Sequence, residues 1–521
     1  MKLDYFFKKG YRFPSSIGNS SSYGSVFNYL NLYSPSYMRE KIRDCLRVFG
    51  HRGNIPQIVF VDHHLSHAYQ TYFQSSFNES LVLVVDGHGE ENCISGYRVN
   101  NGVFHKILNY EVPYSLGWFY GGFTAYLGFQ ANRDEGKMMG LAAYGEARKD
   151  TNPWLERLSK IISLENGDFA IDPLFFKLGG NEYHPRYTDH LVKFITSFDS
   201  EMLPIGLNET VEQDGEIINK YFLDKYVDLA FAVQKYLEDS LINITNKMVN
   251  ETGIKNLCIA GGVAMNCKAN REILDNTDID NIFIHPASSD DGSAIGSAFY
   301  VAKERGDKVR NILTNVQLGA SFSNDEIKRA LDSSHISYIK SDDVGVDGAK
   351  LLNEGKILSW FQDGFEMGAR ALGGRSIIAS PIYKEMKDKV NKNVKYREMW
   401  RPYTPSILEE HQDEYIEDSV DSPFMILAGK AKKRLIENAP AVVHVDNSIR
   451  PQTVKKESLP KWHNLINQHY KLSKHPIILN TSFNVRGEPI VSTPFDAIRT
   501  FYSTGLDNLI IGDFIVSKNK R

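Results

Sequence analysis

Short apolar runs that end at turns containing glycine or aspartate constrain the fold of this chain more than any other feature. The runs occupy residues 58–61, 81–85, 257–260 and 282–284. Apolar runs of this length predict buried strands. A long amphipathic stretch over residues 224–250 predicts a helix that stops at Gly253. Strands mixed with helices along the chain predict an α/β fold.

A second set of elements follows a polar, loop-like stretch at residues 302–325. The chain has 521 residues, which is too long for one ordinary domain. We therefore predict two domains, residues 1–315 and 316–521. In the second domain, strands are expected at residues 356–361, 476–479 and 509–516. A helix is expected from Pro494 to about Tyr502, with Thr493 as its N-cap.

The charge balance argues against a chain built to bind nucleic acid or an anionic membrane. The 60 basic and 64 acidic residues are mixed throughout and give a net charge of -4. No apolar run is long enough to cross a membrane, and the first residues do not resemble a signal peptide. The four cysteines show neither a CxxC zinc spacing nor the density of a disulfide framework. These features predict a cytoplasmic protein.

His63 and His67 are four residues apart, so a helix that starts here would place both side chains on one face. That spacing suits two imidazole ligands of a metal ion, and incidental histidines at the start of a surface helix are the alternative. Asp86 and Asp290 each follow a predicted strand and could complete the coordination shell, or they could cap turns. Two histidines and two aspartates suit iron, manganese or zinc better than calcium.

Glycines follow three of the predicted strands, at Gly87, at Gly261 and Gly262, and at Gly292. Glycine lets the backbone approach phosphate oxygens and present its N–H groups to them. One such loop would be weak evidence because turns need glycine anyway, but three of them indicate a bound nucleotide. No loop has the Walker pattern, which favours a phosphate grip of the actin and sugar-kinase type.

The second half of the chain concentrates cations and amides near turns. Arg370 lies in a glycine-rich turn, Lys395 and Arg401 lie beside aromatic residues, and Asn480 and Ser482 follow a predicted strand. Guanidinium groups bind phosphates bidentately, and amides orient a small planar group. Because the chain lacks a wider basic face, a small phosphorylated ligand fits better than nucleic acid. Ion pairs with nearby acids are the alternative.

Several segments, taken in order, resemble the carbamoyltransferases of nodulation-factor, antibiotic and toxin biosynthesis. The segments are residues 63–68, 86–90, 136–142, 260–266, 289–290, 369–373, 400–402 and 480–484. The match runs from about residue 55 to the end of the chain. The resemblance implies a first domain of the actin and sugar-kinase type and a YrdC-like second domain.

The resemblance also implies an ATP-dependent O-carbamoyltransferase. In the family, carbamoyl phosphate is cleaved in the second domain, and the carbamate moves internally to the ATP site. There it attacks the α-phosphate and gives carbamoyl adenylate and pyrophosphate. The acceptor is a hydroxyl of a small molecule or glycan.

Matched by position, the resemblance assigns a role to each motif residue. A divalent metal ion, in the family commonly iron(II), would be held by His63, His67, Asp86 and Asp290. The ATP-binding site would be lined by Gly87, Gly117, Gly261, Gly262 and Asn266. Carbamoyl phosphate would be bound by Arg370, Lys395, Arg401, Asn480 and Ser482.

The chain departs from the family pattern before the matched region, where a strand–turn–strand hairpin is expected and not found. A misplaced start site, a hairpin supplied by another chain or by a homodimer partner, and an inactive or regulatory relative are the alternatives. The intact motifs favour the first. A threonylcarbamoyl-type transferase acting on tRNA is a second enzymatic hypothesis. The acidic balance and the carbamoyl phosphate residues of the second domain argue against it.

Overall fold

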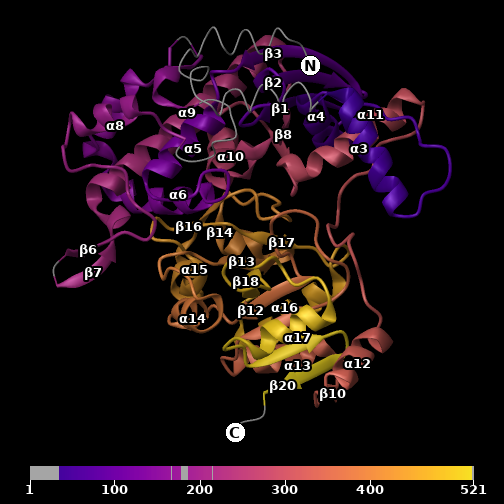
Figure 1. Ribbon diagram of the computed structural model, residues 1–521. Helices are drawn as coiled ribbons and strands as arrows, with labels where there is room; N and C mark the ends of the chain where they lie inside the picture. The colour runs from indigo at the N-terminus through magenta and orange to yellow at the C-terminus, as the bar shows by residue number, and fades with distance from the viewer. Residues whose placement is uncertain (1–33, 166, 178–185, 214, 519–521) are drawn as a thin grey trace. The chain divides into compact units, whose positions relative to one another are not determined.

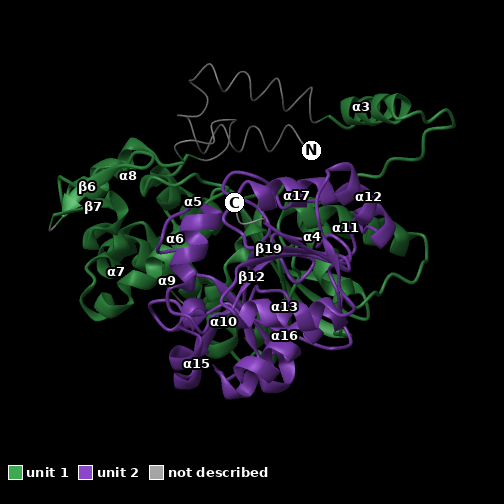
Figure 2. Cartoon of the chain, turned by 90° about the horizontal axis from the view of Figure 1, so that it is seen from below, with its two compact units in different colours: residues 1–312 green, residues 313–521 purple. Residues whose placement is uncertain are grey.

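The computed structural model describes residues 34–165, 167–177, 186–213 and 215–518. The chain divides into two units, residues 1–312 and 313–521, which Figure 2 shows in separate colours. Each unit contains a mixed sheet accompanied by helices (Figure 1), so the predicted α/β class is confirmed. The expected N-terminal hairpin concerns a part of the protein outside the described residues.

The main sheet of the first unit has the strand order β3-β2-β1-β8-β9. Its strands are β1 (Glu79–Val85), β2 (Asn92–Asn100), β3 (Val103–Glu111), β8 (Asn256–Ala260) and β9 (Asn281–Ile284). The first three form an antiparallel meander, whereas β1, β8 and β9 run parallel. Three predicted strands are thereby confirmed. Because parallel strands end at the same edge of a sheet, the turns after β1 and β8 lie side by side.

The first unit also contains α-helices, several of which pack against this sheet. They are α3 (Pro35–Val48), α4 (His63–Gln74), α5 (Leu116–Tyr126), α6 (Glu135–Ala142), α7 (Trp154–Arg157), α8 (Asp189–Thr196), α9 (Asp224–Thr252), α10 (Cys267–Asn276) and α11 (Ser293–Glu304). Two small hairpins are β4–β5 (Ile162–Ser163, Ala170–Ile171) and β6–β7 (Thr210–Gln213, Glu216–Asn219). Helix α9 ends as predicted at Gly253, whose φ of 70° is left-handed.

One predicted strand of the first unit, at residues 58–61, is wrong. These residues form neither strand nor helix, and Val59 and Phe60 are 44% and 47% exposed. An apolar run records hydrophobicity, but a strand also requires a neighbouring backbone with which to pair. Among the described residues, no strand pairs with this segment.

The main sheet of the second unit has the order β10-β20-β19-β11-β12-β18-β13-β17. Its strands are β10 (Ile339–Lys340), β11 (Leu358–Phe361), β12 (Arg375–Ala379), β13 (Thr404–Leu408), β17 (Gln452–Val454), β18 (Ile477–Ser482), β19 (Asn508–Ile511) and β20 (Phe514–Ser517). Strands β11 and β18 confirm two predictions. The single strand expected over residues 509–516 is wrong, because the chain reverses at Gly512 (φ 53°) to form the antiparallel pair β19 and β20.

Helices cover both faces of this sheet. They are α12 (Asn324–Ser333), α13 (Val344–Asn353), α14 (Met386–Val390), α15 (Lys433–Asn438), α16 (Pro460–Ser473) and α17 (Pro494–Tyr502), with a small sheet β14 (Ile416–Glu417), β15 (Gly429–Ala431) and β16 (Ser448–Ile449). Helix α17 begins at the predicted cap, where the Thr493 side chain accepts from the Asp496 N–H.

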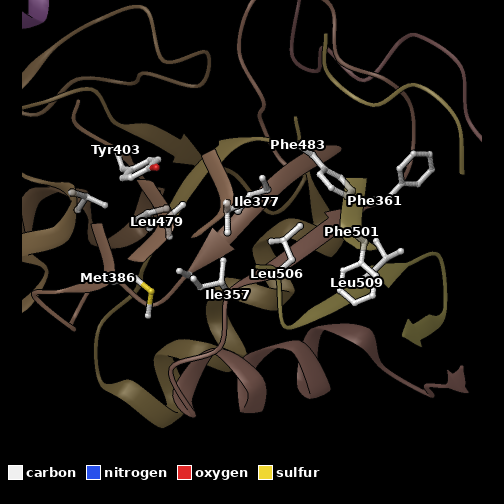
Figure 3. Packing of buried hydrophobic residues seen from close by; sticks show 14 of the residues in the cluster. Ile357, Phe361, Ile377, Met386, Tyr403, Leu479, Phe483, Phe501, Leu506 and Leu509 are labelled. Atoms are coloured by element: carbon white, nitrogen blue, oxygen red, sulfur yellow. The ribbon is translucent and has the colours of Figure 1, made fainter. Parts of the chain in front are cut away.

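The alternation of strand side chains divides the core of the second unit into two layers. Phe361 packs with Leu479, Phe501 and Leu509 on one face (Figure 3). Its neighbour Trp360 belongs to the opposite layer, as expected from the two-residue period of a strand. No helix within the described residues is long and apolar enough to span a membrane.

Candidate active site

Helix α4 presents two histidines to one point. The helix begins at His63 because the Asp62 side chain caps it, accepting from the Leu65 N–H at 2.8 Å. His63 and His67 therefore project from one face, one turn apart. Their Nε2 atoms lie 3.2 Å from each other, with His67 fully buried.

Asp86 follows the last residue of β1 and faces the two histidines. Its Oδ1 accepts hydrogen bonds from the backbone N–H groups of Gly87 at 2.7 Å and Gly262 at 3.3 Å. Its Oδ2 lies 2.9 Å from His63 Nε2 and 3.4 Å from His67 Nε2. One carboxylate oxygen is thus fixed by the turns after β1 and β8, and the other faces the imidazoles.

Asp290 completes the group from a short turn before α11. Its Oδ1 lies 3.5 Å from His63 Nε2 and 3.6 Å from His67 Nε2, and the four donor atoms all lie within 4.8 Å of one another. Four ligands at about 2.1 Å from a tetrahedral metal would be about 3.4 Å apart. The nitrogen and oxygen donors and their separations therefore fit a divalent transition metal, which these residues would hold.

The histidines and aspartates of this cluster shift one another's pKa values. Burial alone would lower the pKa of His63, but hydrogen bonds with Asp290 and Asp86 raise it to about 10. Burial alone would raise the pKa of Asp86, but His63 and His67 hold it below its usual range. Hydrogen bonds from the same histidines lower the pKa of Asp290 to about 2. These shifts arise because each histidine Nε2 lies 2.9–3.6 Å from both carboxylates.

Two neighbouring side chains support the cluster without joining it. His64 turns away, with Nδ1 2.9 Å from Ser95 Oγ, and burial lowers its pKa to about 3. Glu90 accepts from the His63 N–H at 3.2 and 3.3 Å, which ties the start of α4 to the turn after β1.

Several of the glycines predicted to bind the nucleotide lie around Asp86. At two of these positions a side chain would clash with neighbouring backbone atoms. A Cβ on Gly117 would lie 2.9 Å from both Asp86 O and Gly87 N, so the start of α5 packs directly on this turn. Gly261 has a φ of 92°, and a Cβ there would lie 2.2 Å from Val85 O. These glycines allow three chain segments to meet beside the carboxylate.

Asn266 occupies the N-cap of α10 and belongs to a buried amide network. Its Oδ1 accepts from the Ala269 N–H, and its amide pairs reciprocally with that of Gln234 at 2.9 and 3.1 Å. Gln234 also accepts from the Tyr120 hydroxyl and donates to Glu238. Burial raises the pKa of Glu238 to about 7. The sequence analysis missed this network because its members lie on elements far apart in the chain.

Lys395 is the most enclosed of the predicted residues in the second unit. It ends a π-helix, Asn391–Lys395, and is 4% exposed. Its Nζ donates to the carbonyl and hydroxyl oxygens of Ser482 at 2.8 and 3.2 Å, and to the carbonyl and amide oxygens of Asn484 at 2.9 and 2.6 Å. Burial, followed by the charges of Arg397 and Arg401, lowers its pKa well below the usual range. The structure thereby joins Lys395 and Ser482, and it adds Asn484.

The turn that follows Arg370 is held by buried side chains. Asn480, fully buried, donates to Ala371 O at 3.0 Å, and Gln452 donates to Leu372 O at 2.9 Å. Glu366 accepts from three backbone N–H groups of the same turn. Asn480 is therefore next to the Arg370 turn. The sequence analysis missed Glu366 and Gln452, which belong to no motif.

Arg401 lies in the loop after the π-helix. Its Nη1 is 3.8 Å from a carboxylate oxygen of Glu398, and its carbonyl accepts from Asn391 at 3.5 Å. Its charge is one of those that lower the pKa of Lys395, so the two cations share one part of the second unit.

Comparison with protein families decides the ancestry of the chain. Residues 20–299 match the carbamoyltransferase N-terminus model, and residues 349–518 match the carbamoyltransferase C-terminus model. The chain belongs to the carbamoyltransferase family. It is thereby a transferase, as the sequence analysis predicted.

Similar proteins come from bacteria and archaea. An uncharacterised protein of Synechocystis is 34% identical over 513 residues, which cover 92% of this chain and 80% of that protein. Nodulation protein NolO of Bradyrhizobium diazoefficiens is 34% identical over 468 residues, covering 88% and 79%. An uncharacterised protein of Methanocaldococcus jannaschii is 32% identical over 501 residues, covering 95% and 89%.

Solved structures give a much weaker likeness. The crystal structure of HypF in its phosphate- and nucleotide-bound form is 19% identical to this carbamoyltransferase, with a TM-score of 0.24, and covers 35% of this chain and 22% of that one. So partial an overlap does not establish a common fold or a common ligand. The ligands of this carbamoyltransferase must therefore be inferred from its own side chains.

Proposed function

We propose that this carbamoyltransferase uses ATP to transfer the carbamoyl group of carbamoyl phosphate to a hydroxyl of a small-molecule or glycan acceptor. The observation that carries the proposal is the convergence of two imidazole nitrogens and two carboxylate oxygens beside the glycine turns of the first unit. A cation site next to closely packed glycine turns suits a triphosphate, because both provide positive charge for phosphate oxygens.

In the second unit, cations would bind and cleave carbamoyl phosphate. Arg370, Lys395 and Arg401 would stabilise the departing phosphate, because fixed positive charges lower the energy of developing negative charge. Asn480 and Ser482 would orient the planar carbamoyl group through hydrogen bonds. Water attacks and the bond to phosphate breaks, which leaves carbamate and inorganic phosphate.

In the first unit, carbamate would attack the α-phosphate of ATP. The bond formed joins a carbamate oxygen to phosphorus, the bond broken releases pyrophosphate, and the product is carbamoyl adenylate. A divalent metal, of which iron(II) is our candidate, neutralises phosphate charge when bound. His63, His67, Asp86 and Asp290 would hold it, and the turns at Gly87, Gly117, Gly261 and Gly262, with Asn266, would line the nucleotide.

The acceptor hydroxyl would then attack the carbamoyl carbon and release AMP. Carbamate is unstable in water, so we propose that it passes from the second unit to the first without release into solution. Both proposed half-reactions can be measured separately, because one gives phosphate and the other gives pyrophosphate.

The decisive experiment supplies the protein with ATP, carbamoyl phosphate and Fe²⁺ in the absence of acceptor. Release of phosphate and of pyrophosphate is expected. Arg401→Ala should abolish phosphate release while ATP binding persists. Arg499→Ala, on an exposed side chain of α17 paired with Glu488, is the matched control and should change neither. No release of either product would identify an inactive relative, and loss of ATP binding in Arg401→Ala would refute the assignment of the two ligands to separate units.

A further inference from the structure

Gln70 lies on the face of α4 that carries the two histidines. It follows His67 by three residues and His63 by seven, so the three side chains share one stripe of the helix. It is fully buried. Its Nε2 donates to Ala287 O at 2.5 Å and to His285 Nδ1 at 2.7 Å. The helix that carries two candidate ligands is thereby tied to the chain just before Asp290.

The chemistry of His285 fixes the direction of these bonds. Its Nδ1 also accepts from the Ala287 N–H at 3.0 Å, so this nitrogen is the acceptor and the ring proton is on Nε2. Burial lowers the pKa of His285 to about 3, which keeps the ring neutral. Ala287 O can only accept, so the amide nitrogen of Gln70 must face it. Gln70 and His285 together clamp residues 285–287.

Asp290 needs such an anchor because its own side chain has little support. The side chain is 72% exposed, and within the described residues its carboxylate contacts only His63 and His67. The turn that carries it packs on Gln70 so closely that a Cβ on Gly292 would lie 1.8 Å from the Gln70 Nε2. The position of the Asp290 carboxylate therefore depends on how this turn packs against Gln70.

We propose that Gln70 and His285 are positioning residues of the metal centre, which hold Asp290 against His63 and His67. The proposal rests on the metal centre of the proposed function and adds two residues to it. Outer partners of metal ligands are typically worth about 10–100-fold in metal affinity. The effect of Gln70 would operate through Asp290 and not through the overall fold.

The test uses Co²⁺ alone as the probe, with the full-length protein, followed by visible absorption and by calorimetric titration. Gln70→Met keeps the volume of the side chain and removes the donor, and we expect Co²⁺ to bind about 10–100-fold more weakly. Gln74→Met is the matched control. Gln74 lies on the same helix and is buried, but within the described residues it makes no hydrogen bond to residues 285–292. The Gln74→Met protein should bind Co²⁺ with the same affinity as the unchanged protein.

A double-mutant cycle with Asp290→Asn separates positioning from general loosening. If Gln70 acts through Asp290, adding Gln70→Met to Asp290→Asn lowers the affinity no further. Full additivity, or unchanged affinity in Gln70→Met, overturns the proposal. His285→Asn, which retains an acceptor near the position of Nδ1, should retain more affinity than His285→Leu, and equal losses also overturn it. If the unchanged protein binds no Co²⁺, the metal centre of the proposed function fails together with this inference.

Discussion

The candidate sites of the two units differ in how fully their own side chains satisfy one another. In the first unit, His63, His67 and two carboxylates direct their donor atoms at a common point, and one of the carboxylates is largely exposed. In the second unit, the ammonium of Lys395 is enclosed by four oxygen atoms of Ser482 and Asn484. The first arrangement would be completed by a cation, whereas the second already pairs its cation with protein oxygens.

This difference separates two ways of handling phosphate. The first unit would neutralise a phosphate through an added ion and through closely packed turns. The second would use fixed side-chain charge, with Lys395 both supplying charge and holding the 482–484 turn in place. A change to Lys395 therefore removes two contributions at once, while a change to Asp290, whose carboxylate faces only the two histidines among the described residues, removes one.

The largest expected effect follows from exchanging one residue in each unit. Lys395→Met should lower phosphate release from carbamoyl phosphate by at least about 10²–10³-fold, the usual loss for one charge-stabilising donor. Asp86→Asn should instead abolish pyrophosphate release and metal binding, with phosphate release retained. Product assays on both variants check this, with Asp291→Asn, an exposed neighbour of Asp290, as control. Equal loss of both products in both variants would contradict separate sites.

The next effect concerns stability at the strand ends of the first unit. Gly261→Ala should lower the free energy of unfolding by at least about 3 kcal/mol, because the new Cβ meets Val85 O at 2.2 Å and the φ of 92° is unfavourable. Gly136→Ala lies in α6, with nothing within 4 Å of its Cβ, and should be neutral or stabilising by up to about 1 kcal/mol. Urea unfolding of both proteins measures the difference. Similar stability for the two would show that the turn after β8 can shift.

The same comparison shows what sequence can and cannot predict. The spacing of His63 and His67, together with acids after strands, was sufficient to place four residues that the structure brings together. The apolar runs predicted the strands that precede Asp86 and Asp290. Because these strands run parallel, the turns after them lie at one edge of the sheet. The strand expected at residues 58–61 failed because pairing cannot be read from one segment.

Residues whose roles depend on a distant neighbour escaped the sequence analysis. Gln70 gains its meaning from His285, more than two hundred residues away, and Asn484 from Lys395. Gln70 has no motif, because one amide in a helix resembles any other. Asn484 lies in the matched segment 480–484, but that segment does not reveal its contact with Lys395. The split of residues 509–516 into β19 and β20 was missed for a more local reason: Gly512 and Asp513 interrupt a run that is apolar on both sides.

A pH dependence of moderate size is expected in the first unit. Burial raises the pKa of Glu238 from 4.5 to about 7, so the folded protein binds an extra proton between these values. Stability from this group is present below pH 4.5 and is lost as the pH rises to 7, a change of about 3 kcal/mol. Glu238→Gln should therefore match the unchanged protein near pH 4.5 and be more stable by up to this amount at pH 8. Thermal unfolding at both values measures it, with Glu251→Gln, exposed on the same helix, as control.

The smallest expected effect concerns Glu366. It tests whether buried charges of the second unit other than Lys395 are also paired within the protein. Glu366 is 2% exposed, and its Oε1 accepts from the N–H groups of Leu372, Gly374 and Arg375 at 2.9, 2.6 and 3.0 Å. Its Oε2 has no hydrogen-bond partner among the described residues. In Glu366→Gln, the amide oxygen keeps the three bonds but loses the negative charge that strengthens them, which costs about 1–2 kcal/mol.

Glu366→Gln should also weaken carbamoyl phosphate binding more than turnover, because this turn follows Arg370 directly. Burial lowers the pKa of Arg375 to about 10 against the opposing charges of Glu366 and Asp363, so loss of one carboxylate leaves that buried cation less well balanced. Urea unfolding and the KM for carbamoyl phosphate measure the two consequences, and Glu437→Gln, exposed on α15, should alter neither. An unchanged KM with lowered stability would make Glu366 a support of the fold alone, and the contrast between the two units would then rest on Lys395.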